Sequence, residues 1–268
     1  MIASEIQAGN THQEITGTIL WLTGWSIPDT VFNRLQALLP DFHHHSVDYS
    51  AADSPEEMLI LIETAAVHVR SSNGPSSRAR AIDSPLLIGG WSLGGLLALK
   101  LAGKGYADGL VLFAATARFT RAKEESDLGW ADAFVRQMIT GIMKDRLGVE
   151  AKFRQNMLTE EEWEAGQGKS LPQEGSWTTP ALIAGLQILR SEDCVPQLPE
   201  ILCPVLLIHG TADKICPYGA ASELAARLPQ ASLLSMPGCG HAPFMEREAF
   251  IADKMRRWWH EQQDSASI

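Results

Sequence analysis

Residues 85–101 constrain the fold of this chain more than any other stretch. They read Pro-Leu-Leu-Ile-Gly-Gly-Trp-Ser-Leu-Gly-Gly-Leu-Leu-Ala-Leu-Lys-Leu. The apolar run after the proline predicts a strand buried on both faces, and the leucines after the serine predict a helix. Gly90, Ser92 and Gly94 match G-x-S-x-G, which places the serine on a sharp strand-to-helix turn. We therefore expect Ser92 to be a nucleophile, with the amide of Leu93 at the helix N-terminus facing a developing negative charge.

The interpretation of Ser92 depends on partners elsewhere in the chain, because G-x-S-x-G alone arises by chance in about one chain in ten of this length. A serine hydroxyl also needs a base before it can attack. The apolar run at 204–209 is followed by Gly-Thr-Ala-Asp213, and the run at 231–236 is followed by Pro-Gly-Cys-Gly-His241. We predict that His241 takes the proton of Ser92 and that Asp213 fixes the tautomer of His241.

Other readings of these acidic and imidazole groups are weaker. Asp213 and His241 each stand in turn-forming sequence, where either residue taken singly is often only a loop cap. Asp193 is a rival acid, but it precedes a predicted strand instead of following one. His209 lies inside a strand pattern, so we expect it to be packed.

Charge and composition limit the classes of partner. The chain has 268 residues, of which 45% are hydrophobic, and a formal net charge of −10, which disfavours nucleic-acid binding. No apolar run reaches the length of a membrane span, and residues 1–13 lack a secretory signal pattern. The four cysteines have no C-x-x-C spacing, so we expect reduced thiols and no metal site. These features predict a cytoplasmic protein, expected to be a monomer, with no membrane or nucleic-acid partner.

Alternating strand and helix patterns predict an α/β fold with a mostly parallel sheet and helices on both faces. Strands are expected at 17–22, near 47–48, and at 86–88, 109–114, 204–209 and 231–236. Helices are expected at 32–39, 55–70, after Ser92, and at 219–228 and 246–260, with a solvated loop at 71–80 and a frayed tail at 262–268. The run His43-His44-His45 is expected to be a polar strand end, since neighbours on a strand point to opposite faces.

The alternation stops between residues 118 and 190, where helices separated by polar turns are expected. We call this segment the lid. The predicted division is therefore a core formed by residues 1–117 and 191–268 with a helical cap at 118–190.

The segments Thr23-Gly24-Trp25, Gly-Trp-Ser92-Leu-Gly-Gly, Gly-Thr-Ala-Asp213 and Gly-His241-Ala-Pro-Phe together resemble the α/β-hydrolase superfamily over nearly the whole chain. The order Ser, Asp, His is the order of that fold. The second and fourth segments, with Gly-Leu-Gln-Ile-Leu at 185–189, are similar to the pimeloyl-acyl-carrier-protein methyl ester esterases of biotin synthesis. Thr23 departs from the pattern, because the superfamily commonly has histidine there.

The resemblance implies site residues beyond the triad. Trp25 and Leu93 would line the acyl site and supply oxyanion amides. In the lid, Phe153 is a candidate for the acyl pocket, although helical spacing favours packing within the lid for most of its apolar side chains. Arg136 and Arg154 are candidates for binding an acidic carrier protein. Residues 118–154 contain eight basic against six acidic side chains, the sign that such docking requires, although a solvated helix surface explains the same mixture.

These observations predict a serine esterase that works through an acyl-enzyme and needs no cofactor. The expected substrate is a pimeloyl-type methyl ester on an acyl carrier protein. A broad short-chain carboxylesterase is the alternative, and proline aminopeptidases and C–C hydrolases share the motifs. A non-catalytic ligand-binding protein of this fold is the remote alternative, since it would have no use for all three triad residues.

Overall fold

A single parallel sheet forms the centre of the computed structural model, which describes residues 15–72 and 84–266. The strand order is β2-β1-β3-β4-β7-β8, and every neighbouring pair is parallel. The strands are β1 (Gly17–Leu22), β2 (Phe42–Ser46), β3 (Leu86–Trp91), β4 (Gly109–Phe113), β7 (Val205–Gly210) and β8 (Ala231–Met236). The α/β prediction is confirmed.

Burial along the strands explains why the sequence folds in this order. Every residue of β1, β3, β4 and β7 is buried, as an apolar strand between two helix layers requires. The strands β2 and β8 lie at the two edges and are only partly buried. The buried strands β1, β3 and β7 therefore lead directly into loops that carry residues of the candidate site.

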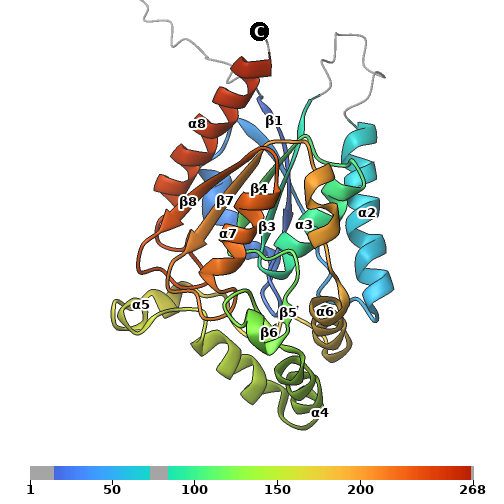
Figure 1. Cartoon of the computed structure of the whole chain (residues 1–268), viewed down its shortest axis with the longest axis vertical. Coiled ribbons are helices and arrows are strands. Elements are labelled where there is room, and N and C mark those ends of the chain that lie inside the picture. The colour runs from blue at the N-terminus through green and yellow to red at the C-terminus, as the bar shows by residue number, and fades with distance from the viewer. Residues whose placement is uncertain (1–14, 73–83, 267–268) are drawn as a thin grey trace, which may run out of the picture.

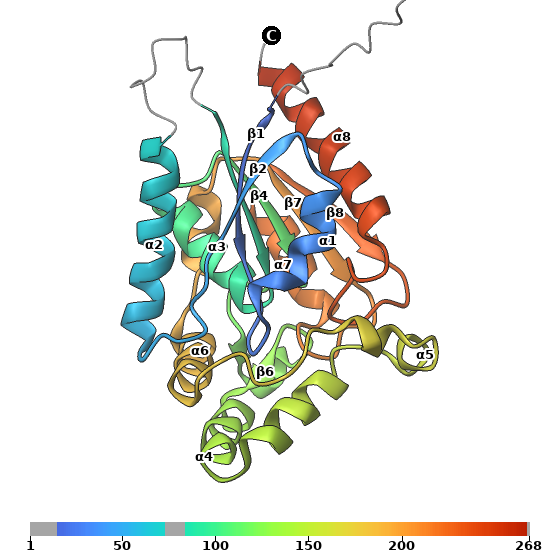
Figure 2. The ribbon, with the colours of Figure 1, turned by 180° about the vertical axis from the view of Figure 1, so that it is seen from behind.

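Helices cover both faces of the sheet. The helices α3 (Leu93–Gly103) and α7 (Tyr218–Arg227) lie in front of the sheet in Figure 1, with α2 (Pro55–Ser72) beside α3. Figure 2 shows the opposite face, where α1 (Asn33–Ala37), preceded by η1 (Asp29–Phe32), packs near α8 (Glu248–Ala266). The short helix η4 (Val195–Glu200) leads into β7.

The lid elements gather at the end of the molecule where the strands finish (Figure 1). They are β5 (Thr120–Arg121), η2 (Lys123–Glu125), β6 (Trp130–Ala131), α4 (Asp132–Gln155), α5 (Glu160–Glu164), η3 (Gln167–Ser170) and α6 (Thr179–Ser191). The helix α4 is kinked at Asp145, whose backbone is not helical and whose Oδ1 accepts a hydrogen bond from the amide of Gly148. The side chain of Asp145 thus caps the second half of α4.

Several predicted boundaries are wrong. The second strand is Phe42–Ser46 and includes the histidine run, because His44 is held between the indole N–H of Trp21 and the carbonyl of Leu39. The expected tail at 262–268 is helical as far as Ala266. The lid contains the short pair β5–β6 in addition to helices. Most of the loop predicted at 71–80 lies outside the described residues.

Within residues 15–72 and 84–266, every helix is too short or too polar to span a bilayer.

Candidate active site

Ser92 lies on a strained turn between β3 and α3, with φ 57° and ψ −117°. Glycines permit the turn: a Cβ on Gly90 would stand 2.4 Å from the carbonyl oxygen of Gly94, and one on Gly94 would stand 2.0 Å from that of Leu22. The helix α3 begins at Leu93, so Leu93 carries one of the amides that a helix N-terminus leaves without an intrahelical partner. A non-glycine residue in such a conformation costs about 1–3 kcal/mol, which points to a functional reason for it.

Asp213 and His241 meet at the ends of β7 and β8. The Nδ1 atom of His241 lies 2.8 Å from Oδ2 of Asp213. The other carboxylate oxygen, Oδ1, accepts hydrogen bonds from the amides of Ile215 (2.8 Å) and Cys216 (3.0 Å). These two amides orient the carboxylate, and the carboxylate in turn assigns the proton to Nδ1 of a neutral imidazole.

The second ring nitrogen of His241 is the one available for chemistry. Its Nε2 atom is buried and has no hydrogen-bond partner among the residues that the structure describes. The backbone of His241 is fixed on both sides, because its N–H donates to the carbonyl of Met157 (2.6 Å) and its carbonyl accepts from the indole of Trp91 (2.7 Å). Trp91 precedes Ser92, so the backbone of His241 is anchored to the chain next to that serine.

The loop after β1 runs beside Ser92. A Cβ on Gly24 would stand 3.5 Å from the Cβ of Ser92. The hydroxyl of Tyr49 donates to the carbonyl of Thr23 (2.5 Å), and the indole of Trp25 donates to the carbonyl of Leu182 in α6 (2.7 Å). The backbone of residues 23–25 is thus held against Ser92, where oxyanion donors of this fold are required.

Trp25, Leu93 and Phe153 form an apolar contact between core and lid. The rings of Trp25 and Phe153 pack edge to face, with centroids 4.8 Å apart. A Cβ on Gly185 of α6 would stand 2.8 Å from Cδ1 of Trp25 and 3.1 Å from Cδ2 of Leu93. Phe153 also lines a cavity of about 650 Å³ between α4 and the β5–β6 segment, together with Trp130, Phe134 and Met138 among others.

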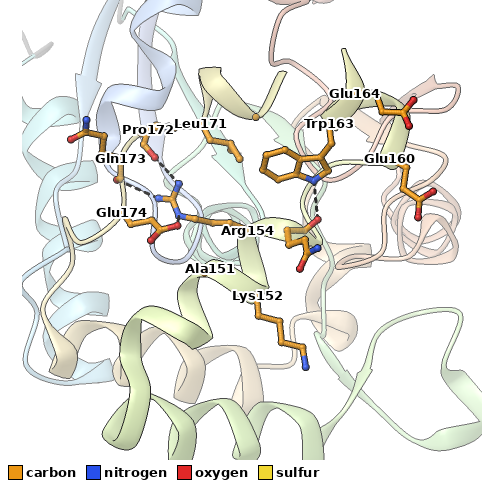
Figure 3. A pocket seen from close by; sticks show the side chains of 12 residues that line it. Ala151, Lys152, Arg154, Glu160, Trp163, Glu164, Leu171, Pro172, Gln173 and Glu174 are labelled. Atoms are coloured by element: carbon orange, nitrogen blue, oxygen red, sulfur yellow. Dashed lines mark hydrogen bonds and ion pairs between the residues drawn. The ribbon is translucent and has the colours of Figure 1, made fainter. Parts of the chain in front are cut away.

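Arg136 and Arg154 are placed differently. Arg136 is exposed and pairs with Asp132 at 2.9 Å. Arg154 is buried, contrary to the expectation that it offers its charge to a carrier, and burial lowers its pKa. Its guanidinium donates to the carbonyls of Pro172 (2.6 Å) and Gln173 (3.3 Å), as Figure 3 shows, and to that of Ser26 (3.4 Å). The loop after η3 folds over Arg154, a long-range contact that helical spacing cannot reveal.

The rival residues have other partners. Asp193 accepts a hydrogen bond from the amide of Val195 at Oδ1 (2.9 Å), and its Oδ2 lies 3.4 Å from Nη1 of Arg118. Neither partner belongs to the histidine loop. His209 is buried in β7, donates Nε2–H to the carbonyl of Cys216 (2.8 Å), and has a pKa lowered by burial. The Nε2 atom of His209 also lies 3.5 Å from Oδ2 of Asp213, so the ring is a neighbour of the Asp213 carboxylate.

Two buried glutamates of the lid were not anticipated. Glu150 accepts a hydrogen bond from the hydroxyl of Ser26 (2.6 Å). Ser26 lies in the loop after β1 and has a φ of 64°. Glu162 accepts the amide of Gly240, next to His241 (3.0 Å). The spacing Thr159-x-x-Glu162 is a helix-capping signature and predicts the position of Glu162 within the lid, but nothing in the sequence predicts its contact with Gly240.

The remaining candidate groups lie apart from this site. All four cysteines are free thiols. In the part of the chain that the structure describes, no three His, Cys, Asp or Glu side chains are grouped to hold a metal ion, and this includes the histidine run of β2.

Comparison with known proteins gives a family match and full-length relatives. The family described as serine aminopeptidase, S33, matches residues 73–248. A pimeloyl-[acyl-carrier protein] methyl ester esterase of Nitrosomonas europaea is 31% identical over 261 residues, covering 90% of this chain and 96% of that protein. A protein of the same name from Xanthomonas oryzae pv. oryzae is 28% identical over 274 residues, covering 92% and 98%.

Solved structures share the fold at lower identity. An esterase from Exiguobacterium antarcticum superposes with a TM-score of 0.71 at 19% identity and covers 91% of this chain and 92% of its own. A thermophilic esterase from Thermogutta terrifontis also gives 0.71 at 19% identity, with 93% and 91% covered. A bromoperoxidase from Bacillus anthracis gives 0.69 at 13% identity, covering 92% and 93%.

Proposed function

From the premise that this chain belongs to the serine aminopeptidase S33 family of α/β-hydrolases and is an esterase of that serine hydrolase class, we propose that Ser92, His241 and Asp213 are its catalytic triad. The observation that carries the proposal is the orientation of His241. Asp213 occupies its Nδ1, and its buried Nε2 has no partner among the described residues. That nitrogen is left to accept a proton from a nucleophile.

The proposed reaction proceeds through an acyl-enzyme. The Oγ atom of Ser92 attacks the ester carbonyl while Nε2 of His241 takes its proton. The amides of Leu93 and Trp25 stabilise the tetrahedral oxyanion, each donor contributing about 100- to 1000-fold in rate. The intermediate expels the alcohol, which leaves with the proton from His241. Water then attacks the acyl-enzyme, gives its proton to His241, and releases the acid as the proton returns to Ser92.

We further propose that the substrate is a pimeloyl methyl ester carried by an acyl carrier protein. Relatives of that name match nearly the whole chain. The cavity of about 650 Å³ beside Phe153 has room for an acyl chain and is lined by Trp130, Phe134 and Met138. Lys123 and Lys152 lie on the same cavity, and neither belongs to an ion pair among the described residues. They are free cations that an acidic carrier would need.

Growth without biotin tests both the chemistry and the substrate. The gene should restore biotin-independent growth to a bacterial strain that lacks its own pimeloyl-ester esterase, whereas the Ser92→Ala variant should not. In vitro, Ser92→Ala should lower turnover of a p-nitrophenyl ester by about 10³-fold or more, because the residual rate comes only from binding and the oxyanion donors.

The two parts of the proposal fail separately. Turnover that survives in a folded Ser92→Ala protein would rule out the triad. Strong p-nitrophenyl esterase activity without restored growth would instead identify a broad carboxylesterase.

A further inference from the structure

Glu162 occupies an unusual position for a lid residue, because its carboxylate joins the start of α5 to the segment between β8 and α8. Its side chain is 5% exposed. The Oε2 atom accepts the amide of Thr159 (3.1 Å), completing the capping box that begins α5, and also the amide of Gly240 (3.0 Å). The Oε1 atom pairs with Nη2 of Arg247 at 3.2 Å.

The contact with Gly240 reaches the candidate base directly. Gly240 precedes His241, and the amide of His241 donates to the carbonyl of Met157 (2.6 Å). Two successive amides of the histidine loop are thus bound to the lid. A Cβ on Gly240 would stand 2.5 Å from the carbonyl oxygen of Met157 and 3.0 Å from Oε2 of Glu162, so the close approach depends on the glycine.

We propose that Glu162 is a positioning residue that sets the imidazole of His241 in register with Ser92. The inference rests on the proposed function, because it assumes that His241 is the base. The hydrogen bond that Nδ1 of His241 donates to Asp213 fixes the ring only at Nδ1, so the place of Nε2 also depends on the backbone of residues 240–241. A misplacement of about 1 Å in a catalytic group can cost about 10²-fold in rate.

Both oxygens of the carboxylate are needed for this role. A glutamine at 162 would keep one oxygen for the amides of Thr159 and Gly240, but its NH₂ group would face the guanidinium of Arg247, donor against donor. An alanine would remove every contact. Activity should therefore fall in two steps: Glu162→Gln should be less active than the parent protein, and Glu162→Ala should be less active than Glu162→Gln.

The test compares Glu162→Ala and Glu162→Gln with the control Glu160→Gln. Glu160 lies in the same first turn of α5, is exposed, and loses the same charge on substitution. The readouts are kcat and KM on a p-nitrophenyl ester, and the second-order rate of labelling by a fluorophosphonate, which reports activation of Ser92. We expect Glu162→Ala to lower kcat and the labelling rate together, by about 10²-fold. KM should stay within about twofold, because no atom of Glu162 contacts the apolar cavity beside Phe153.

Glu162→Gln should regain part of the lost rate, and Glu160→Gln should match the parent. An unchanged kcat in folded Glu162→Ala, or a rise in KM alone, would overturn the positioning role. So would failure of both Glu162 variants to fold while Glu160→Gln folds, since Glu162 would then be a folding residue. Failure of the proposed function looks different: the parent protein itself would not be labelled, or Ser92→Ala would still turn over ester.

Discussion

At the scale of the residue, His44 shows how local contacts set a protonation state. The indole N–H of Trp21 donates to Nδ1 of His44, so Nδ1 must be unprotonated and Nε2 carries the hydrogen that meets the carbonyl of Leu39. Burial lowers the pKa of His44, although Asp41 opposes the shift. The unfolded chain therefore binds a proton at this site more readily than the folded chain.

The expected consequence is a stability that falls in mild acid. Because the folded pKa of His44 is below its unfolded value of about 6.5, stability should be complete above that pH and decline as pH drops from 6.5 toward the folded pKa. Thermal unfolding at pH 8, 7, 6 and 5 measures the decline, and His44→Gln should make it shallower. An identical slope in His44→Gln would assign the acid sensitivity to other groups, among them buried His209.

The sequence places Asp213 and His241 directly after apolar runs, and the structure brings their side chains to within 2.8 Å of each other. Their catalytic roles stay a prediction. Arg154 was misplaced because its burial depends on carbonyls 18 and 19 residues away. The link between Glu162 and Gly240 spans 78 residues, and no local pattern encodes such a contact.

At the scale of the element, the packing of α3 on β1 depends on Gly94. A Cβ there would enter the backbone of Leu22, which cannot move aside as a flexible side chain would. Gly94→Ala should therefore destabilise the protein by about 1–3 kcal/mol or more, measured as a lower midpoint of urea unfolding.

A control within the same helix separates steric clash from helix propensity. A Cβ on Gly103 would meet only the far end of the Gln197 side chain, so Gly103→Ala should be neutral or stabilising by up to about 1 kcal/mol. If both variants unfold at the same urea concentration, the close contact between α3 and β1 does not limit the stability of the protein.

Buried strands are the elements best predicted from sequence, because a mostly apolar run leaves few alternatives. The prediction for 17–22 coincides with β1, and that for 204–209 lies within one residue of β7. The position of β2 is not predicted correctly, because its three histidines are polar and yet one of them, His44, is half-buried in an edge strand. The two-residue strands β5 and β6 carry no periodic signal, since they exist only through pairing with each other.

At the scale of the whole molecule, charge distribution sets what can approach the lid. A net charge of −10 repels an acidic carrier, so attraction must come from local cations such as Lys123 and Lys152. Raising the salt from 0.05 to about 0.5 M shortens the screening length to a few ångströms. Hydrolysis of a carrier-bound ester should then slow, while hydrolysis of a p-nitrophenyl ester should not.

Charge reversal assigns the effect to particular side chains. The double variant Lys123→Glu, Lys152→Glu should raise KM for the carrier-bound ester at low salt and leave the small ester unaffected. The double variant Lys144→Glu, Lys169→Glu is the matched control, because it changes the charge by the same amount at two exposed lid lysines that do not line the cavity. Equal effects of the two double variants would mean that the lid attracts the carrier only through its overall charge.

The fold class is predictable because it depends on the order of elements along the chain. The division into a core and a cap at 118–190 stays a prediction. How the insertion meets the core depends on paired contacts between distant segments, such as Trp25 with Leu182 and Trp177 with Ile27.

The hydrogen bond from the amide of His241 to the carbonyl of Met157 ties the backbone of the proposed base to the lid. Any opening of the lid that carries Met157 away from the core also releases the backbone of the base. Such a displacement would also shift Nε2 of the imidazole, so the geometry of the proposed triad depends on the position of the lid as well as on the sheet.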